Sequence, residues 1–254
     1  MLTAERRKKI LELIETRSSI TVNELCDLLH VSDMTIRRDL RVLANDRLLE
    51  RVHGGALSQR GRSYEPPYLI RTTKFVKQKE LIGRCAAQFI KEGDTIGLDV
   101  GTTTLELAKA MIGIPNLTVV TASLSIAQVL RNAFNIRLIL TGGILRKEEG
   151  SLIGHIAQRT FEEFKIDKAF VGIGGFHLSV GLTEYNLEDA LVKKAMIPSA
   201  NQIIVLADSS KLEETCFTFV APLSLVDILV TDEGAPVEIV DTLTSQGIQV
   251  VIAR

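Results

Sequence analysis

Residues 32–44 read Ser32-Asp33-Met34-Thr35-Ile36-Arg37-Arg38-Asp39-Leu40-Arg41-Val42-Leu43-Ala44, or SDMTIRRDLRVLA. The apolar residues Ile36, Leu40 and Leu43 recur at the three-to-four-residue spacing of one buried helix face. Serine is a favoured N-cap residue, so the pattern predicts a helix that begins directly after Ser32. The outward side of this helix then carries one methionine and three arginines, with a threonine on its flank: Met34, Arg37, Arg38, Arg41 and Thr35.

Two further helices are expected before this segment. The first spans residues 2–16, where Ile10, Leu13 and Ile14 have helical spacing. The second begins at residues 21–24, TVNE, which have the form of a capping box: the threonine hydroxyl accepts from the third helical N–H while the glutamate reaches back. Its buried residues are expected to be Val22, Leu25, Leu28 and Leu29. Because only residues 30–31 separate this helix from the next, the pair predicts a helix-turn-helix.

Residues 48–56, LLERVHGGA, follow the third helix. Strand-forming residues that end in two glycines predict a β-hairpin, which would form the wing of a winged helix-turn-helix. Such a helix enters the major groove of DNA, where an arginine can donate two hydrogen bonds to guanine. Asp39 is expected to orient a neighbouring arginine rather than contact DNA. The residues expected to contact DNA are Ser32, Met34, Thr35, Arg37, Arg38 and Arg41 of the helix and Arg51 and His53 of the wing. The alternative is a small helical domain with a solvated arginine face.

Charge is unevenly distributed along the chain. Residues 1–79 contain 16 Lys and Arg against 10 Asp and Glu, whereas residues 80–254 contain 14 against 21. A basic first part suggests a polyanionic partner for that part alone. The cysteines Cys26, Cys85 and Cys216 have no paired spacing, which argues for a reducing cytosol and against a disulfide framework or a zinc site. With a charged start and no long apolar run, we expect a cytoplasmic protein without a membrane anchor.

The hydrophobic periodicity stops between residues 58 and 76, which predicts a linker. Arg60 and Arg62 of this linker could add contacts to DNA phosphates. The expected domains are therefore 1–57 and 77–254. Beyond residue 77, helical and strand-like segments alternate, which is the rhythm of an α/β domain with a mostly parallel, Rossmann-like sheet. The expected strands include residues 95–98, 117–120, 136–140, 169–171, 203–206 and 228–230.

Polar residues and glycines gather just after several of these strands. Ligands of open α/β sheets bind at the carboxyl ends of strands. The segment DVGTTT, residues 99–104, is the most informative, because a glycine permits close approach and hydroxyls with helix N-terminal N–H groups suit a phosphate. A purely capping role for these residues is the alternative. Lys211 could add a cation, or could simply be an exposed lysine.

The segments TIRRDL and LLERVHGGA resemble the DNA-binding domain of the DeoR family of regulators. The ordered segments DVGTTT, VTAS, LTGG, DKAFVGIGGF, GLTEYN and ADSSK resemble its C-terminal sensor domain, which is similar in fold to ribose 5-phosphate isomerase and glucosamine-6-phosphate deaminase. By that resemblance Gly101, Thr102, Thr103 and Thr104 would bind a phosphate, and Asp99 would orient this loop or bond a sugar hydroxyl. The remaining residues that would line the effector pocket are Thr121, Ser123, Gly142, Gly143, Gly174, Gly175 and Lys211.

The resemblance implies a transcription regulator, a repressor, whose binding to operator DNA responds to a phosphorylated sugar or an intermediate of sugar metabolism. Two copies would be needed to fill two half-sites, so a homodimer or homotetramer is expected, with no cofactor and no metal. The main alternative is a sugar-phosphate isomerase with a DNA-binding appendage. Residues 172–176, GIGGF, contain no carboxylate for acid–base catalysis, although Asp99, Glu184 and Glu188 remain as possible acid–base groups. A body that only mediates oligomerisation is a further alternative.

Overall fold

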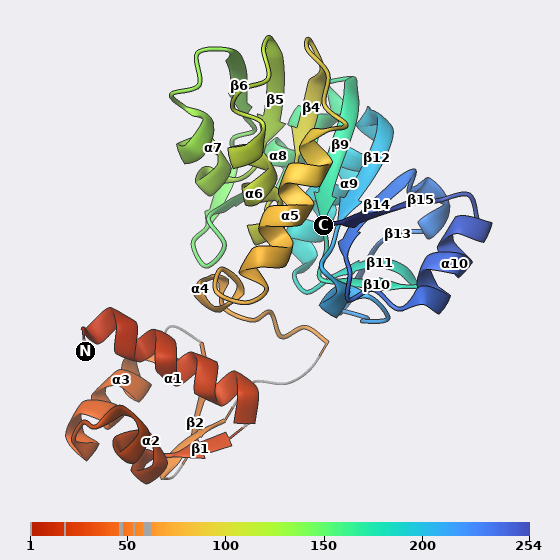
Figure 1. The fold of residues 1–254 in the computed structure, drawn as a ribbon. Helices are drawn as coiled ribbons and strands as arrows, with labels where there is room; N and C mark the ends of the chain where they lie inside the picture. The colour runs from red at the N-terminus through yellow and green to blue at the C-terminus, as the bar shows by residue number, and fades with distance from the viewer. Residues whose placement is uncertain (1, 18, 46–47, 53, 58–61) are drawn as a thin grey trace. The chain divides into compact units, whose positions relative to one another are not determined.

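The computed structural model describes residues 2–17, 19–45, 48–52, 54–57 and 62–254 (Figure 1). The chain divides into two compact units, residues 1–74 and residues 75–254. His53 and Arg60, both considered above as DNA contacts, lie outside the described residues. Every helix in the described ranges is too short or too polar to span a lipid bilayer. In the same ranges, no group of three His, Cys, Asp or Glu side chains is arranged to hold a metal ion.

The first unit consists of short helices and a three-stranded antiparallel sheet of order β1-β3-β2. Its elements are α1 (Thr3–Arg17), β1 (Ser19–Thr21), α2 (Val22–Leu29), α3 (Asp33–Asn45), β2 (Glu50–Val52), β3 (Gly55–Leu57) and α4 (Tyr68–Arg71). The predicted helix-turn-helix and hairpin are confirmed. The capping box is also present, because the Thr21 side chain accepts from the Glu24 N–H and the Glu24 carboxylate accepts from the Thr21 N–H.

The core of the first unit follows the predicted apolar stripes with one exception. Ile36 and Leu40 are fully buried and Leu43 is 3 % exposed. Leu28 is 44 % exposed, so its predicted burial is wrong. The buried stripe of the short helix α2 consists of Val22, Leu25 and Leu29 alone, and Leu28 falls beside it.

A buried carboxylate ties α3 to α1. Asp39 is 1 % exposed. Its two oxygens accept hydrogen bonds from Arg6 Nε at 2.6 Å and Arg7 Nε at 2.8 Å. Asp39 therefore faces the interior of the unit, and the arginines it binds belong to α1 and not to its own helix.

Part of the expected linker is structured. Within residues 62–76, Tyr68–Arg71 form α4, and Ile70 is fully buried in the core of the first unit. Arg71 is bound by Glu65, whose carboxylate lies 2.8 Å from the guanidinium. A single apolar residue in a four-residue helix leaves no periodic pattern, so the sequence gives no sign of this packing.

The second unit is built on a seven-stranded parallel sheet of order β15-β14-β12-β9-β4-β5-β6. The strands are β4 (Thr95–Leu98), β5 (Leu117–Thr121), β6 (Ile136–Leu140), β9 (Ile166–Gly172), β12 (Ala200–Leu206), β14 (Ile228–Asp232) and β15 (Gln249–Ala253). The predicted α/β class with a mostly parallel sheet is confirmed.

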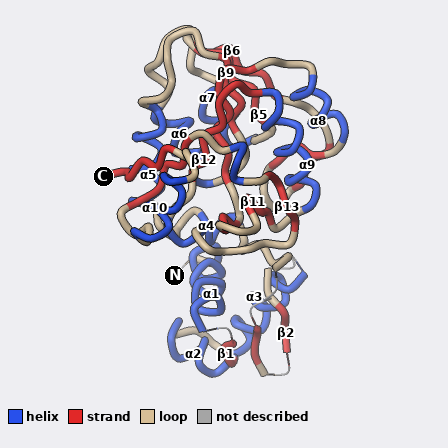
Figure 2. Tube along the Cα trace, turned by 90° about the vertical axis from the view of Figure 1, so that its right-hand side faces the viewer, coloured by secondary structure: helices blue, strands red, loops and turns tan. Residues whose placement is uncertain are grey.

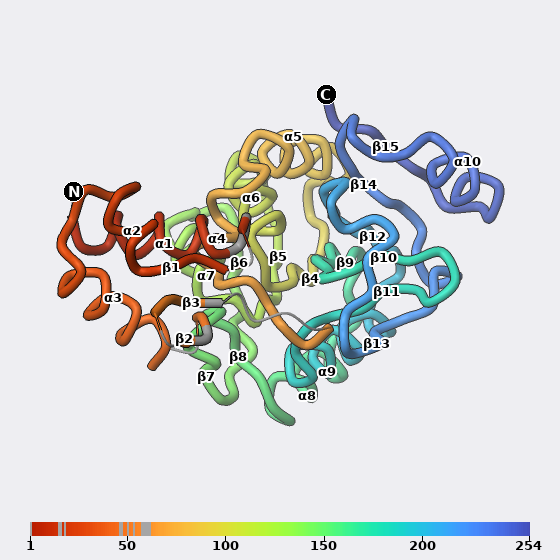
Figure 3. The backbone as a smooth tube through the Cα atoms, turned by 90° about the horizontal axis from the view of Figure 1, so that it is seen from below, coloured from red at the N-terminus to blue at the C-terminus, as the bar shows by residue number. Residues whose placement is uncertain are grey.

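Helices cover both faces of this sheet. They are α5 (Val76–Ala87), α6 (Thr102–Ala110), α7 (Leu124–Leu130), α8 (His155–Glu162), α9 (Leu187–Met196) and α10 (Val237–Ser245). Successive side chains along a strand pack into two different cores, one on each face of the sheet. On β12, Ile203 and Val205 belong to one core, and Ile204 and Leu206 belong to the other. Figures 2 and 3 show α5 and α6 on one side of the sheet and α8 and α9 on the other.

Two small antiparallel sheets complete the second unit. One pairs β7 (Ile144–Arg146) with β8 (Ser151–Ile153). The other consists of β10 (Gly175–His177), β11 (Gly181–Glu184) and β13 (Thr218–Ala221). These strands have only three or four residues each, and the alternation of longer elements does not reveal them.

Candidate functional site

The exposed side of α3 carries the residues that the sequence placed there. Met34 is 81 % exposed, and Arg37, Arg38 and Arg41 are all exposed, whereas Thr35 is half-buried on the flank. Ser32 directly precedes the helix, and its hydroxyl lies 2.9 Å from the Thr35 hydroxyl. These side chains present cations and hydrogen-bonding groups on one surface, which is what contact with the edges and phosphates of a DNA groove requires.

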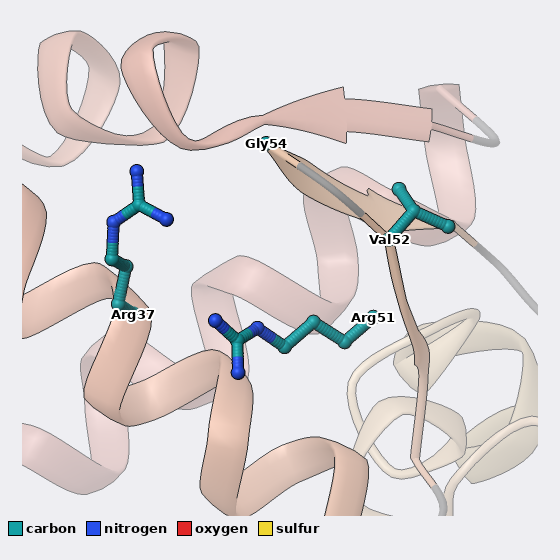
Figure 4. A pocket seen from close by; sticks show the side chains of 4 residues that line it. All are labelled: Arg37, Arg51, Val52 and Gly54. Atoms are coloured by element: carbon teal, nitrogen blue, oxygen red, sulfur yellow. The ribbon is translucent and has the colours of Figure 1, made fainter.

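The hairpin of β2 and β3 carries Arg51, which lies close to Arg37 on the exposed side of α3. Arg51 is exposed on β2, and with Arg37 it lines a pocket of about 280 Å³ together with Val52 and Gly54 (Figure 4). The helix N-terminus has an ion pair, because Asp33 accepts from Arg37 Nε at 2.5 Å. This bond and the positive charge of Arg37 hold the pKa of the Asp33 carboxyl below its ordinary value. The pocket itself is lined by two cations.

The second group of predicted residues lies at one edge of the large sheet. Five polar loops follow β4, β5, β6, β9 and β12, and these five strands are consecutive neighbours in the sheet order β12-β9-β4-β5-β6. Because parallel strands end at the same edge, the loops come together there. The residues predicted to bind an effector lie in these loops or in the ends of the strands and helices that border them: Asp99, Gly101, Thr102, Thr103, Thr104, Thr121, Ser123, Gly142, Gly143, Gly174, Gly175 and Lys211.

The loop after β4 leads into α6 without a side-chain cap. Gly101, the N-cap residue, has a φ of 144°, a conformation that favours glycine. The Thr104 hydroxyl donates to the Gly101 carbonyl at 3.1 Å. The hydroxyls of Thr102 and Thr103 form no hydrogen bond with any of the described residues. The first turn of α6 therefore has no side-chain cap and carries two hydroxyls without a hydrogen bond to the described residues, a combination that suits an anion.

Other predicted residues in these loops have clear structural roles. The Thr121 hydroxyl accepts from the Ser123 N–H, and the Ser123 hydroxyl accepts from the Ile126 N–H as the N-cap of α7. A Cβ on Gly143 would lie 2.4 Å from the Ile153 carbonyl oxygen, so only glycine fits against β8. Lys211 Nζ lies 3.4 Å from the Tyr185 hydroxyl.

The remaining predicted glycines are also tightly packed. Gly142 has a φ of 77°. A Cβ on Gly175 would lie 2.5 Å from the Glu214 carbonyl oxygen. A Cβ on Gly174 would lie 2.9 Å from both the Cys216 sulfur and the Glu184 Oε1. The Cys216 thiol has its pKa raised by burial to about 11, so it is not a reactive thiolate at neutral pH.

A buried ion cluster that the sequence did not reveal lies beside these loops. Lys193 on α9 donates to Asp99 Oδ2 and lies 3.4 Å from Glu184 Oε2. Asp99 Oδ2 also accepts from the Gly172 N–H at 2.9 Å, which links the loop after β4 to the end of β9. One helical turn before Lys193, Asp189 binds Arg146 and accepts from the Ser151 hydroxyl at 2.8 Å. Two ion pairs on one face of α9 thus hold the loop after β4 and the β7–β8 hairpin.

The cluster has perturbed protonation equilibria. Burial raises the pKa of Asp99 from 3.8 to about 6, and the positive charge of Lys193 opposes this shift without cancelling it. Burial would lower the pKa of Lys193, but the carboxylates of Asp99 and Glu184 outweigh burial and raise it above its ordinary value. Lys193 is therefore a protonated donor at neutral pH and not a nucleophile.

The raised pKa of Asp99 predicts a pH dependence of stability. A carboxyl with a raised folded-state pKa stabilises the fold fully below its unfolded pKa, and this contribution is lost as pH rises through about 6. Asn at position 99 mimics the protonated acid. Between about pH 5 and pH 7, the wild-type free energy of unfolding should fall by of the order of 1 kcal/mol more than that of Asp99→Asn. Urea denaturation followed by circular dichroism measures this difference, and equal changes in both proteins would refute the shift.

Both units of the chain match models of one protein family. Residues 6–61 match the DeoR-like helix-turn-helix domain, and residues 74–233 match the DeoR C terminal sensor domain. Among solved structures, a D-ribose-5-phosphate isomerase in complex with phospho-erythronic acid is 20 % identical, with a TM-score of 0.41, 54 % of this chain and 54 % of that chain being covered.

Relatives extend over nearly the whole chain. The "Uncharacterized HTH-type transcriptional regulator YulB" of Bacillus subtilis is 40 % identical over 250 residues, 98 % of this chain and 96 % of that protein. The transcriptional repressor GlcR of the same organism is 35 % identical and covers 100 % of this chain and 98 % of its own. The glycerol-3-phosphate regulon repressor of Escherichia coli is 32 % identical, with 98 % of each covered. The chain therefore belongs to the DeoR family, and it is a DNA-binding transcriptional regulator.

Proposed function

We propose that the chain is a repressor whose affinity for operator DNA changes when a phosphorylated sugar, or an intermediate of sugar metabolism, binds the second unit. The observation that carries this proposal is the meeting of five polar loops at one sheet edge, beside the uncapped α6 N-terminus and the unengaged hydroxyls of Thr102 and Thr103. The names of relatives, such as the glycerol-3-phosphate regulon repressor, support the same class of effector.

In this proposal α3 enters the major groove and the β2–β3 hairpin lies beside it. One such unit contacts few base pairs, so two chains fill two half-sites one helical turn apart, as a homodimer or homotetramer in the cytoplasm. Size-exclusion chromatography with light scattering, on and off DNA, checks this assembly. A monomer in both conditions would contradict it.

We infer that the second unit senses its ligand and does not turn it over. The segment after β9, residues 172–176, contains no carboxylate, and Asp99 Oδ2 is already bound by Lys193 and by the Gly172 N–H. Incubation with ribose 5-phosphate and other aldose phosphates, followed by a coupled assay for the ketose product, tests this inference. Turnover that Asp99→Asn abolishes would favour an isomerase.

The direct test is fluorescence anisotropy of a labelled duplex from the upstream region of the protein's own gene. The complex is titrated at fixed salt with a panel of sugar and triose phosphates and with the matching free sugars. One phosphate should change the affinity for the duplex, and its free sugar should not. If the duplex binds and none of these compounds changes the affinity, the effector class is wrong.

Replacement of Thr103 by alanine should weaken the response to the effector. Thr103 is 9 % exposed at the first turn of α6, and its hydroxyl forms no hydrogen bond with the described residues, so the hydroxyl is available to a phosphate oxygen. Loss of one hydrogen bond to a charged group should raise the effector concentration at half-response by roughly 10-fold to 100-fold. DNA affinity without effector should stay unchanged. Thr118→Ala, a half-buried threonine on β5 away from the carboxyl edge, is the matched control.

A further inference from the structure

A pocket in the first unit lies between the exposed side of α3 and the β2–β3 hairpin. It has a volume of about 280 Å³ and is lined by Arg37 of α3 and by Arg51, Val52 and Gly54 of the hairpin. Figure 4 shows the two guanidinium groups extending toward the same space from opposite elements. The four lining residues include no carboxylate. The pocket therefore has the charge of an anion-binding site.

The position of Arg51 follows from the register of the hairpin. Arg51 pairs with Ala56 on β3, so the two side chains leave the same face of the hairpin. Ala56 is 1 % exposed and belongs to the core of the first unit, so this face is the one turned toward the helices. Arg51 has no hydrogen-bond or ion-pair partner among the described residues. Its charge is thus directed toward α3, where no side chain of the described part of the chain pairs with it.

Arg37 is held in place by an acidic residue one turn before it. Arg37 donates to Asp33 through Nε at 2.5 Å and through Nη2 at 3.0 Å. These two bonds use one edge of the planar guanidinium and leave Nη1 and the second proton of Nη2 for another acceptor. Asp33 does not line the pocket. The acidic residue therefore partly offsets the charge of Arg37 while it fixes the direction of its second edge.

The exposed side of α3 consists of two neighbouring stripes of side chains. Asp33 and Arg37 lie one turn apart on the side that faces the hairpin, whereas Met34, Arg38 and Arg41 form the neighbouring stripe. We propose that Arg37 and Arg51 together bind one phosphodiester group of the DNA backbone in this pocket, and that base reading belongs to the neighbouring stripe. This proposal rests on the placement of α3 in the major groove. It assigns Arg37 to a phosphate, with Asp33 as its positioning residue.

Salt dependence distinguishes a phosphate contact from a base contact. The slope of log Kd against log salt counts neutralised phosphates, at about 0.9 for each. Affinities of wild type, Arg37→Ala, Arg51→Ala and Arg37→Ala/Arg51→Ala are measured on a mixed-sequence duplex over a range of salt. Because both arginines share one phosphate, the double variant should lower the slope by about 0.9 per bound chain, and not by the roughly 1.8 expected for two separate phosphates. Both replaced side chains are exposed, and circular dichroism verifies that all three variants fold.

Arg38→Ala is the matched comparison, because it removes the same charge from the same helix outside the pocket. In this variant the slope of log Kd against log salt on the mixed-sequence duplex should stay unchanged. The preference for the upstream duplex over the mixed-sequence duplex should be lost. A slope that falls by about 1.8 in the double variant, or that does not fall, would overturn the shared phosphate while leaving DNA binding itself intact. Loss of discrimination in Arg37→Ala with an unchanged slope would instead make Arg37 a base reader.

The same chemistry could be supplied by a free anion. Inorganic phosphate, added at constant ionic strength without DNA, is followed through the side-chain Nε–H resonances of Arg37 and Arg51. Shifts of these two resonances on addition of phosphate, together with a DNA slope that is unchanged in the double variant, would show a site for free phosphate and overturn the proposal. Failure of the wild-type protein to bind either duplex at any salt would contradict the placement of α3 in DNA and not this pocket alone.

Discussion

Replacement of Lys193 by methionine should lower the free energy of unfolding of the second unit by about 3–5 kcal/mol. The lysine side chain is 2 % exposed and binds Asp99 and Glu184, which are themselves buried. Methionine keeps most of the side-chain length but leaves two carboxylates close together without a cation. The cost of an uncompensated buried charge, and not the lost contact alone, accounts for the size of the effect.

Urea denaturation at neutral pH, followed by circular dichroism, measures this change. Lys194→Met is the matched control, since Lys194 is the next residue on α9 and is exposed, with its ammonium 5.9 Å from the Phe219 ring centroid. The control should lose less than about 1 kcal/mol. The destabilisation by Lys193→Met should also shrink below about pH 6, where Asp99 takes up a proton. Equal losses in the two variants would show that the buried cluster contributes little.

Replacement of Arg38 by alanine should have the largest effect on operator binding. Arg38 lies in the middle of the exposed side of α3 and has no hydrogen-bond or ion-pair partner among the described residues. Loss of a bidentate contact to a base costs about 1–3 kcal/mol, or roughly 5-fold to 150-fold in affinity for each bound chain. If two chains bind, the loss applies at both half-sites.

Fluorescence anisotropy at fixed salt, on the upstream duplex and on a mixed-sequence duplex, measures this loss. Only the affinity for the upstream duplex should fall, and effector binding by the second unit should stay unchanged. An equal loss on both duplexes would mean that Arg38 contacts the backbone. Thermal unfolding should match that of the wild type, because the replaced side chain is exposed.

The features that were predictable from sequence are those set by neighbours along the chain. The capping box of Thr21 and Glu24 and the buried stripe of Ile36, Leu40 and Leu43 depend on residues within two helical turns. The parallel sheet also follows from local signals, because strands that alternate with helices have few other ways to pack. The loops at its carboxyl edge come together as a consequence of that topology.

What escaped prediction depends on contacts between distant segments. Lys193 lies three residues after buried Ala190 on α9, which in principle marks a lysine on an apolar face. Its partners are 94 and 9 residues away along the chain, so the spacing alone identifies neither Asp99 nor Glu184. Arg51 and Arg37 face one pocket only because the hairpin folds back toward α3. The individual contributions of the predicted DNA and effector contacts stay predictions until the variants are measured.

The carboxylate of Asp39 makes the DNA-binding unit depend on two arginines of α1. Both of its partners, Arg6 and Arg7, belong to the first turns of α1. A protease that trims the chain beyond residue 7 would remove both cations at once and leave a charged group inside the core of the unit. This proteolysis would abolish operator binding although α3 itself remains intact.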